Sequence, residues 1–129
     1  MQAEQIISSL KAGMRVATVP QQLESVFAPP VQRYLISWMK YDPVKEIAKL
    51  DQPILVVQGT VDTQVDVADG QMLAAANSKA QLLIVDGVAH MLKDATLDAD
   101  SQMATLTDPT LPLDTTVANG VVSFVQSLP

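Results

Sequence analysis

The sequence predicts an α/β fold in which a helical segment is followed by a β-α-β-α arrangement with two parallel strands. Two short apolar runs, residues 53–59 and 81–87, lack the polar alternation of a half-exposed strand, which favours strands covered on both faces. Residues 65–77 between them are compatible with a helix and long enough for the right-handed crossover that joins parallel strands. Residues 2–50 carry apolar side chains at helical spacing between prolines.

Composition sets the class of protein. The 129 residues fit one domain or part of one, and 48% hydrophobic against 17% charged residues indicates a chain that forms a core. A net charge of −6 without a Lys/Arg cluster argues against a nucleic-acid partner. No apolar run approaches the roughly 20 residues of a membrane span.

The cysteine and histidine counts limit the chemistry. The absence of cysteine excludes disulfides and thiolate nucleophiles, and a single histidine without HExxH or clustered carboxylates argues against a transition-metal site. The first ten residues lack the basic region and the long apolar core of a signal peptide. Any signal peptide would lie upstream of Met1, so the sequence leaves the compartment open.

The first half, residues 1–50, is predicted to be a helical segment of its own. Residues 3–13 place apolar side chains on one face and end at Gly13, a suitable C-cap. Residues 20–27 begin with Pro20, which the first turn of a helix tolerates. Asp42 followed by Pro43 is typical of an N-cap with proline at the first helical position, and opens another helix.

Residues 30–40 form the clearest amphipathic pattern, and they allow two interpretations. Apolar side chains recur at i, i+3, i+4, i+7 and i+8, namely Val31, Tyr34, Leu35, Trp38 and Met39. Four aromatic residues fall close together, namely Phe27, Tyr34, Trp38 and Tyr41. These aromatics form either the core of a helical subdomain or the face of a lid that closes over an apolar substrate pocket. In the second interpretation Tyr34, Trp38 and Met39 bind substrate.

The second half, residues 51–129, carries the predicted strands and three further features. Asp66 is the expected N-cap of the crossover helix, and Asp69 supports its first turn electrostatically. Residues 94–112 are predicted to form a polar loop, whose length favours a functional role. Residues 112–128 are predicted to form a closing helix with apolar residues available for burial, namely Val117, Val121, Val122, Phe124 and Val125.

Asp62 and His90 each come just after the end of a predicted strand. In open parallel sheets, binding and catalytic groups collect beyond the carboxyl ends of the strands, so the two side chains are expected at one edge. An Asp that accepts a hydrogen bond from one imidazole nitrogen leaves the other nitrogen free to take a proton from a nucleophile. The sequence therefore predicts an acid–base pair.

Each of these two residues also has a simpler interpretation. An Asp three positions after a strand-ending Gly is an ordinary turn residue that bonds its own backbone. A single His after a strand is more often a packing or surface residue than a catalytic one. Asp86 and Asp94 are nearer to His90 in sequence and remain alternative partners, although spacing favours Asp62.

The run from Pro53 to Ala95, PILVVQGTVDTQVDVADGQMLAAANSKAQLLIVDGVAHMLKDA, resembles the C-terminal part of an α/β-hydrolase. It is most similar to the serine-hydrolase branch with lysophospholipase-like and serine-aminopeptidase-like proteins. In that branch an apolar strand followed by Q-G-x-x-D-x-x-V carries the triad acid, and a later strand leads to the triad His. The resemblance, which extends over about residues 27–128, implies that Asp62 and His90 are these two residues.

The chain departs from the family where the nucleophile is concerned. None of its five glycines falls in a G-x-S-x-G elbow, and there is no HGG-type oxyanion segment. The resemblance therefore implies the C-terminal portion of a hydrolase of acyl esters or amides, which needs no cofactor and is inactive on its own. The alternative is a non-catalytic binding or oligomerising module with a vestigial Asp–His pair.

Two apolar parallel strands have edges that invite pairing with further strands. The sequence therefore predicts a homo-oligomer, and exchange of strands or helices between copies is one form that it can take.

Overall fold

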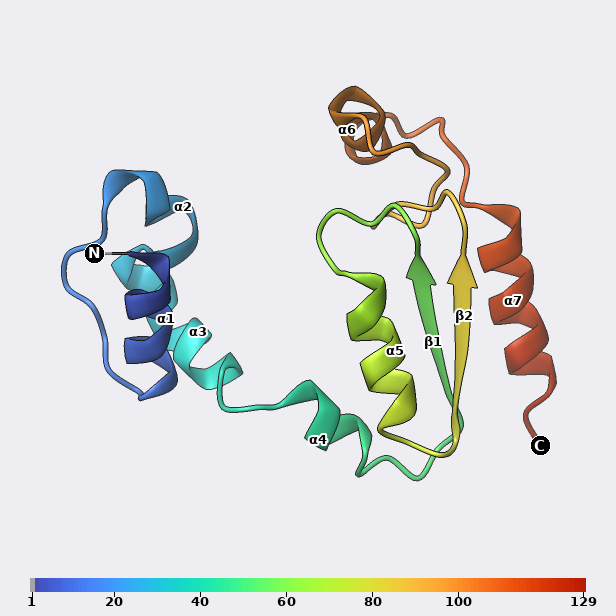
Figure 1. Ribbon diagram of the computed structural model, residues 1–129, viewed down its shortest axis with the longest axis horizontal. Coiled ribbons are helices and arrows are strands. Elements are labelled where there is room, and N and C mark those ends of the chain that lie inside the picture. The colour runs from blue at the N-terminus through green and yellow to red at the C-terminus, as the bar shows by residue number, and fades with distance from the viewer. Residues whose placement is uncertain (1) are drawn as a thin grey trace. The chain divides into compact units, whose positions relative to one another are not determined.

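The computed structural model describes residues 2–129, which fall into two compact units, one ending at Asp42 and one comprising Pro43–Pro129 (Figure 1). The sequence predicts this boundary eight positions later, between residues 50 and 51. Helix α4 (Pro43–Ile47) packs with the second unit, because the buried Asn77 side chain donates hydrogen bonds to the carbonyl oxygens of Ile47 and Leu50 at 2.7 and 2.9 Å.

The first unit is helical, as predicted. Its elements are α1 (Ala3–Lys11), the 3-10 turn η1 (Gln21–Leu23), α2 (Glu24–Phe27), the 3-10 turn η2 (Pro29–Val31) and α3 (Gln32–Trp38). Gly13 closes α1 with a φ of 78°, its N–H bonded to Leu10 O and that of Met14 to Ser9 O. This pair of bonds is a Schellman motif, which confirms the predicted glycine cap.

The core of the first unit surrounds a buried amide. Its buried apolar residues are Ile6, Leu10, Val16, Val19, Phe27 and Leu35. The fully buried Gln32 accepts a hydrogen bond from Val16 N at 2.8 Å and donates to the carbonyl oxygens of Val16 and Phe27, both at 2.9 Å. Because every polar atom of this side chain is paired, its burial joins three chain segments without an unsatisfied group.

Interpreting the aromatic residues as core is wrong for three of the four. Phe27 is buried, but Tyr34, Trp38 and Tyr41 are 65%, 61% and 64% exposed. Tyr34 and Trp38 instead stack on each other, with ring centroids 5.9 Å apart. The inward side of α3 carries Gln32 and Leu35, because the bonds of Gln32 set the rotation of the helix and turn Val31, Tyr34 and Trp38 outward.

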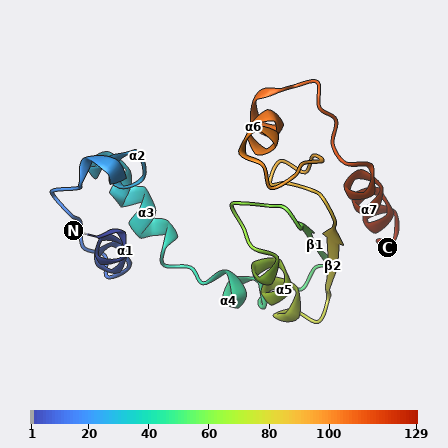
Figure 2. The same cartoon turned by 45° about the horizontal axis from the view of Figure 1, so that its top comes forward.

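The second unit contains the two-stranded parallel sheet that the sequence predicts. Strand β1 (Ile54–Gly59) pairs with β2 (Ala80–Val85), from Ile54 opposite Ala80 to Gly59 opposite Val85. The crossover is α5 (Val67–Ala75), and the chain ends in α6 (Ala99–Thr107) and α7 (Thr115–Gln126). Figures 1 and 2 show both strands pointing toward the end of the sheet nearer α6, with α5 and α7 flanking the sheet.

Two helical glycines mark where the helices approach the sheet. Gly70 of α5 packs on the Gln58 side chain, and Gly120 of α7 packs on Leu83. Gln58 is paired with Ile84, so Leu83 points to the opposite face of the sheet. The helices α5 and α7 therefore cover opposite faces.

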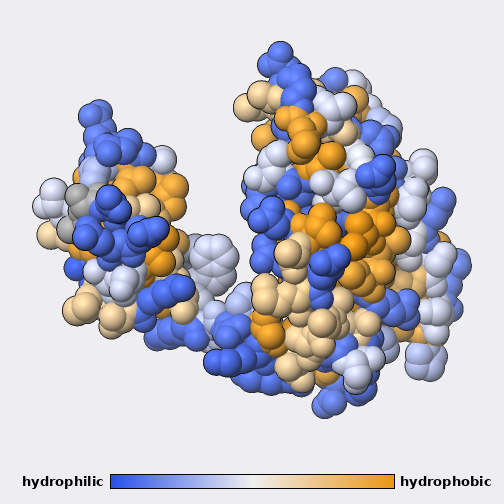
Figure 3. All heavy atoms as spheres, in the orientation of Figure 1, coloured by the Kyte–Doolittle hydropathy of each residue, from blue (hydrophilic) through white to orange (hydrophobic). Residues whose placement is uncertain are grey.

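The cover is incomplete, and the prediction that both strands are buried on both faces is wrong for β2. Leu82 and Ile84 are 38% and 39% exposed. Figure 3 shows hydrophobic residues at the surface of the second unit. Of the residues expected to be buried on α7, only Val117 is buried, whereas Val121, Val122 and Val125 are exposed. Two strands about 5 Å apart present too little surface for the apolar sides of two helices, each about 10 Å wide.

The predicted polar loop over residues 94–112 contains a helix, α6, which is a correction to the sequence analysis. Its N-cap is Asp98, whose carboxylate accepts a hydrogen bond from the N–H of Asp100 at 3.2 Å. Asp98 at the N-cap and the helix-forming residues Gln102, Met103 and Ala104 were the available signal, which the Asp, Ser and Thr residues around them obscured. Within residues 2–129, no helix combines the length and the apolar character needed to cross a lipid bilayer.

Candidate acid–base site at the carboxyl end of the sheet

The ends of the two strands are joined before the site residues are reached. The N–H groups of Thr60 and Val61 donate to the carbonyl oxygens of Val85 and Val88 at 3.0 and 3.2 Å, which continues the parallel pairing into the loops. The Thr60 hydroxyl donates to Asp86 Oδ1 at 2.8 Å and accepts from Gly87 N at 2.9 Å. These bonds fix the relative position of the two loops that carry Asp62 and His90.

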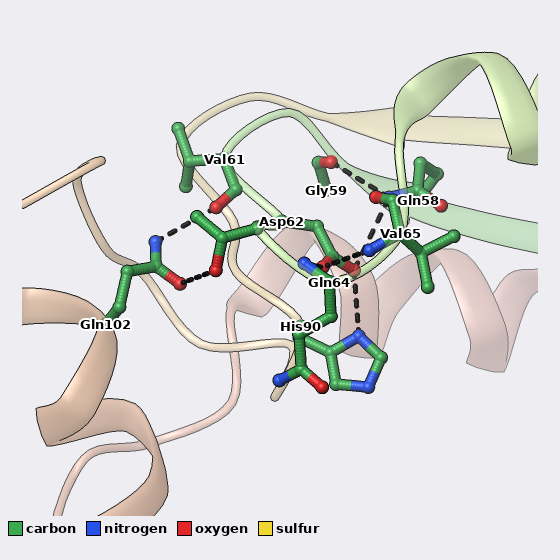
Figure 4. Close-up of polar contacts among 9 residues, drawn as sticks. Gln58, Gly59, Val61, Asp62, Gln64, Val65, His90 and Gln102 are labelled. Carbon is green, nitrogen blue, oxygen red and sulfur yellow. Dashed lines mark hydrogen bonds and ion pairs between the residues drawn. The ribbon is translucent and has the colours of Figure 1, made fainter. Parts of the chain in front are cut away.

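Asp62 uses its two carboxylate oxygens for different purposes (Figure 4). Oδ1 accepts hydrogen bonds from the N–H groups of Gln64 and Val65 at 2.8 and 3.0 Å, which is the turn role that the simpler interpretation expected. Oδ2 lies 2.9 Å from Nδ1 of His90. The turn role and the pairing with histidine therefore coexist in one side chain.

The charge of Asp62 is stabilised at this position. Its side chain is only 8% exposed, and this burial alone raises the pKa of the carboxyl group. The hydrogen bonds from the Val65 and Gln64 N–H groups, together with the bond and charge of His90, outweigh burial and leave the pKa below its ordinary value. Asp62 is therefore ionised at neutral pH.

Gln58 adds a support that the sequence analysis missed. The side chain is buried, and Nε2 donates to the carbonyl oxygens of Gly59 and Val65 at 3.1 and 3.0 Å. Nε2 also lies 3.5 Å from Asp62 Oδ2, at the long limit of a hydrogen bond. Gln58 thus holds both ends of the turn that presents Asp62. A glutamine inside an otherwise apolar strand was the only signal in the sequence.

His90 sits in a turn with a strained residue. Leu92 N donates to Ala89 O at 2.9 Å and Ala89 N to Lys93 O at 3.0 Å, with Leu92 at a φ of 57°. A left-handed conformation costs a bulky residue roughly 1–2 kcal/mol. Leu92 packs against the buried cluster of Val85, Val88 and Val117, and this packing offsets the strain.

The turn leaves one nitrogen of His90 available. The side chain is 40% exposed, and Nδ1 faces Asp62, whereas Nε2 makes no hydrogen bond to residues 2–129. The alternative partners lie elsewhere, since Asp86 accepts from Thr60 and Asp94 is exposed without a bond to His90. Of the three carboxylates considered, the structure brings Asp62 to the histidine.

Helix α6 is fastened beside this pair by two side chains. Gln102 Nε2 donates to Val61 O at 2.9 Å (Figure 4). The same nitrogen donates to Thr96 O at 2.7 Å. Lys93 Nζ donates to the carbonyl oxygens of Thr105 and Asp108 at 3.1 and 3.0 Å, where a cation also complements the helix dipole. Neither residue was singled out from the sequence.

An open pocket of about 340 Å³ lies between α6 and the acid–base pair. Residues of its lining include Thr63, Gln64, His90, Leu97, Met103 and Leu106. All of its lining residues belong to the second unit. Tyr34, Trp38 and Met39, the residues that the sequence analysis assigned to substrate binding, lie in the first unit and are not among them.

The described residues contain no further assembly of ligating groups. Across residues 2–129, no three His, Asp or Glu side chains come close enough together to hold a metal ion. Comparisons of the chain with protein-family models, with curated proteins and with solved structures found no match.

Proposed function

We propose that this chain supplies the acid and the base of a serine hydrolase that acts on acyl esters or amides. The observation that carries the proposal is the 2.9 Å distance between Asp62 Oδ2 and His90 Nδ1, with the other histidine nitrogen unbonded. The position of both residues just beyond the carboxyl ends of paired parallel strands supports it as well. The fold to which the chain contributes is, in this proposal, an α/β-hydrolase.

In the reaction, Nε2 of His90 takes the proton of a serine hydroxyl as its oxygen attacks the acyl carbonyl carbon. The imidazolium then returns this proton to the leaving alkoxide or amine as the bond from the carbonyl carbon to that group breaks. Ionised Asp62 holds the neutral ring with its proton on Nδ1 and stabilises the imidazolium. A water molecule then gives a proton to the same nitrogen and attacks the acyl-serine. The carboxylic acid leaves as the proton returns to the serine oxygen, which regenerates the serine and neutral His90.

The nucleophile and the oxyanion donors come from outside residues 2–129 in this proposal. No serine of the described chain hydrogen-bonds to His90, and all but Ser78 and Ser127 lie within helices. A covalent route needs a serine within hydrogen-bond reach of Nε2. We propose that it belongs to further residues of the same polypeptide or to a second chain.

The test uses the protein as its host makes it, recovered with an antibody raised against the 129-residue chain. A fluorophosphonate probe, which labels only activated serines, is expected to label the recovered polypeptide or a chain that copurifies with it. His90→Ala and Asp62→Ala, introduced into the host gene, are expected to lower the labelling rate by about 10³-fold or more.

Asp94→Asn is the matched control, because it removes an exposed carboxylate four residues from His90 that has no bond to the ring. It is expected to leave labelling unchanged. Absence of a labelled serine, or full labelling of the His90→Ala protein, would contradict the hydrolase proposal.

Exposed apolar residues on β2 and α7 favour a second candidate function, a module that associates with its own copies. Leu82, Ile84 and Val122 are 38%, 39% and 52% exposed, and each strand has one unpaired edge. Such surface promotes association, by strand pairing or by exchange of elements between copies. Sedimentation equilibrium tests it: a dimer or larger oligomer is expected, which Ile84→Lys would dissociate, and a monomer at all concentrations would refute self-association.

A further inference from the structure

We propose that the pocket between α6 and His90 binds the uncharged alkyl part of the acyl substrate, with α6 as its apolar wall. This inference rests on the proposed hydrolase function, because the ligand of the pocket is a substrate only if the acid–base pair belongs to a hydrolase. It assigns substrate contacts to residues of α6 and the preceding loop, and the binding role of Tyr34, Trp38 and Met39 stays a prediction.

Helix α6 has a fixed place beside the histidine. Gln102 joins the middle of the helix to Val61, the residue before Asp62, and Lys93 joins its C-terminal end to the turn that carries His90. The Gln102 bond runs from α6 to a carbonyl group on the loop after β1, and the Lys93 bonds run from the loop after β2 to the carbonyl groups of Thr105 and Asp108. The pocket wall is therefore held in register with the acid–base pair.

This placement leaves an apolar surface of α6 open toward the pocket. Leu97, Met103 and Leu106 line the pocket and are 72%, 56% and 53% exposed. Met103 and Leu106 are three residues apart, so they lie on one side of the helix. Complete burial of a large apolar side chain contributes roughly 1.5–3 kcal/mol. Because these three side chains are more than half exposed, a ligand that covers them would gain much of this free energy on binding.

The charge of the pocket lining limits the ligand as well. The pocket has no Asp, Glu, Lys or Arg in its lining, and His90 is its only titratable group. Thr63, Gln64 and His90 supply polar groups from the strand-end loops. On α6, the polar lining residues Gln102 and Thr105 donate to backbone carbonyl groups, and Met103 and Leu106 are apolar. An apolar wall facing a small set of polar groups suits a ligand with an alkyl chain and one polar head.

The orientation of the ligand follows from this division. The carbonyl head lies toward His90, and the chain lies along Met103 and Leu106. A volume of about 340 Å³ is at the lower end of the usual range for small-molecule sites. The site therefore fits short to medium acyl chains.

The test measures binding to the 129-residue chain and needs no turnover. Neutral primary amides of increasing chain length, from butanamide to octanamide, are titrated into protein with carbon-13 labelled methionine methyl groups. The Met103 methyl and the His90 ring signals are expected to shift together, and affinity is expected to rise about two- to fourfold for each added methylene until the pocket is full.

Variants at exposed positions test the location without disturbing the core. Met103→Lys is expected to weaken octanamide binding at least about tenfold, whereas Met72→Lys, the same change at a 50% exposed methionine of α5, leaves it unchanged. Leu106→Glu serves as a second variant with the same expected loss. Equal affinity in wild type and both pocket variants, or no dependence on chain length, would overturn the proposal.

His90→Ala separates this inference from the proposed function. The variant is expected to bind octanamide within about threefold of wild type, because the apolar wall supplies most of the affinity. Amide binding without a labelled serine in the host protein would support the binding pocket and refute the hydrolase function. A labelled serine without amide binding would support the hydrolase function and refute the binding pocket.

Discussion

The backbone of Gly59, the last residue of β1, lies directly against the backbone carbonyl group of Val88, two residues before His90. A β-carbon at Gly59 would overlap the Val88 oxygen and carbon atoms. This close approach allows Val61 N to bond to Val88 O and brings the acid-bearing loop within reach of the histidine-bearing turn.

Gly59→Ala is therefore expected to destabilise the second unit by about 3 kcal/mol, since backbone atoms rather than a flexible side chain must move. Gly87→Ala is the matched comparison: Gly87 has a φ of 70° but open space around it, so only strain of about 1 kcal/mol is expected. Urea unfolding followed by circular dichroism measures both. If both variants lose the same free energy of unfolding, the backbones of Gly59 and Val88 are far enough apart to admit a β-carbon.

The tautomer of His90 tests its pairing with Asp62 directly. Because the Asp62 carboxylate accepts from Nδ1, the neutral ring is expected to carry its proton on that nitrogen. Nitrogen-15 spectra above pH 8 report the tautomer without assignment, since His90 is the only histidine. Asp62→Asn is expected to shift the equilibrium toward the Nε2 tautomer, and an unchanged spectrum would contradict the pairing.

The lowered pKa of Asp62 predicts that the free energy of unfolding depends on pH. Its folded-state pKa lies below the ordinary value of 3.8, so the ionised carboxyl group stabilises the folded chain. This contribution is complete above the ordinary pKa and is lost as pH falls through the folded-state pKa. The free energy of unfolding of wild type is expected to fall more steeply than that of Asp62→Asn below pH 4. Parallel pH profiles for the two proteins would contradict the depressed pKa.

Gln102 is expected to hold α6 in place. Gln102→Ala removes the bonds to Val61 O and Thr96 O, and about 1–2 kcal/mol of local stability should be lost. Faster hydrogen exchange at amides of residues 99–107 measures this loss, while exchange in β1 and β2 stays unchanged. Gln71→Ala, at an exposed glutamine of α5, is the control. Equal exchange in α6 of both variants would show that Gln102 does not anchor the helix.

Gln32 is expected to be the most sensitive polar residue of the first unit. Gln32→Leu leaves Val16 N, Val16 O and Phe27 O without their partner, and a loss of about 3 kcal/mol is expected. The fluorescence of Trp38, the only tryptophan, reports unfolding of the unit that contains it. Gln22→Leu, at an exposed position, should change stability little. A stabilised Gln32→Leu protein would mean that apolar packing outweighs the amide bonds.

The sequence by itself determined the β-α-β unit, the helical first part and the location of Asp62 and His90 beyond the strand ends. These features depend on local patterns: apolar runs of strand length, proline and glycine at helix ends, and the rule that parallel strands share a carboxyl edge. Asp98 and the residues after it carried the signal for α6, but their polarity made a loop the simpler prediction.

Only the tertiary structure decided which carboxylate meets His90, which face of α3 is buried and where a pocket lies. Asp62 is selected over Asp86 and Asp94 by the direction of its turn, and this direction depends on Gly59 and Gln58. The rotation that exposes Trp38 follows from the bonds of Gln32 to residues distant in sequence. Periodicity states how far apart side chains lie along an element, but contacts between elements decide which of them face inward.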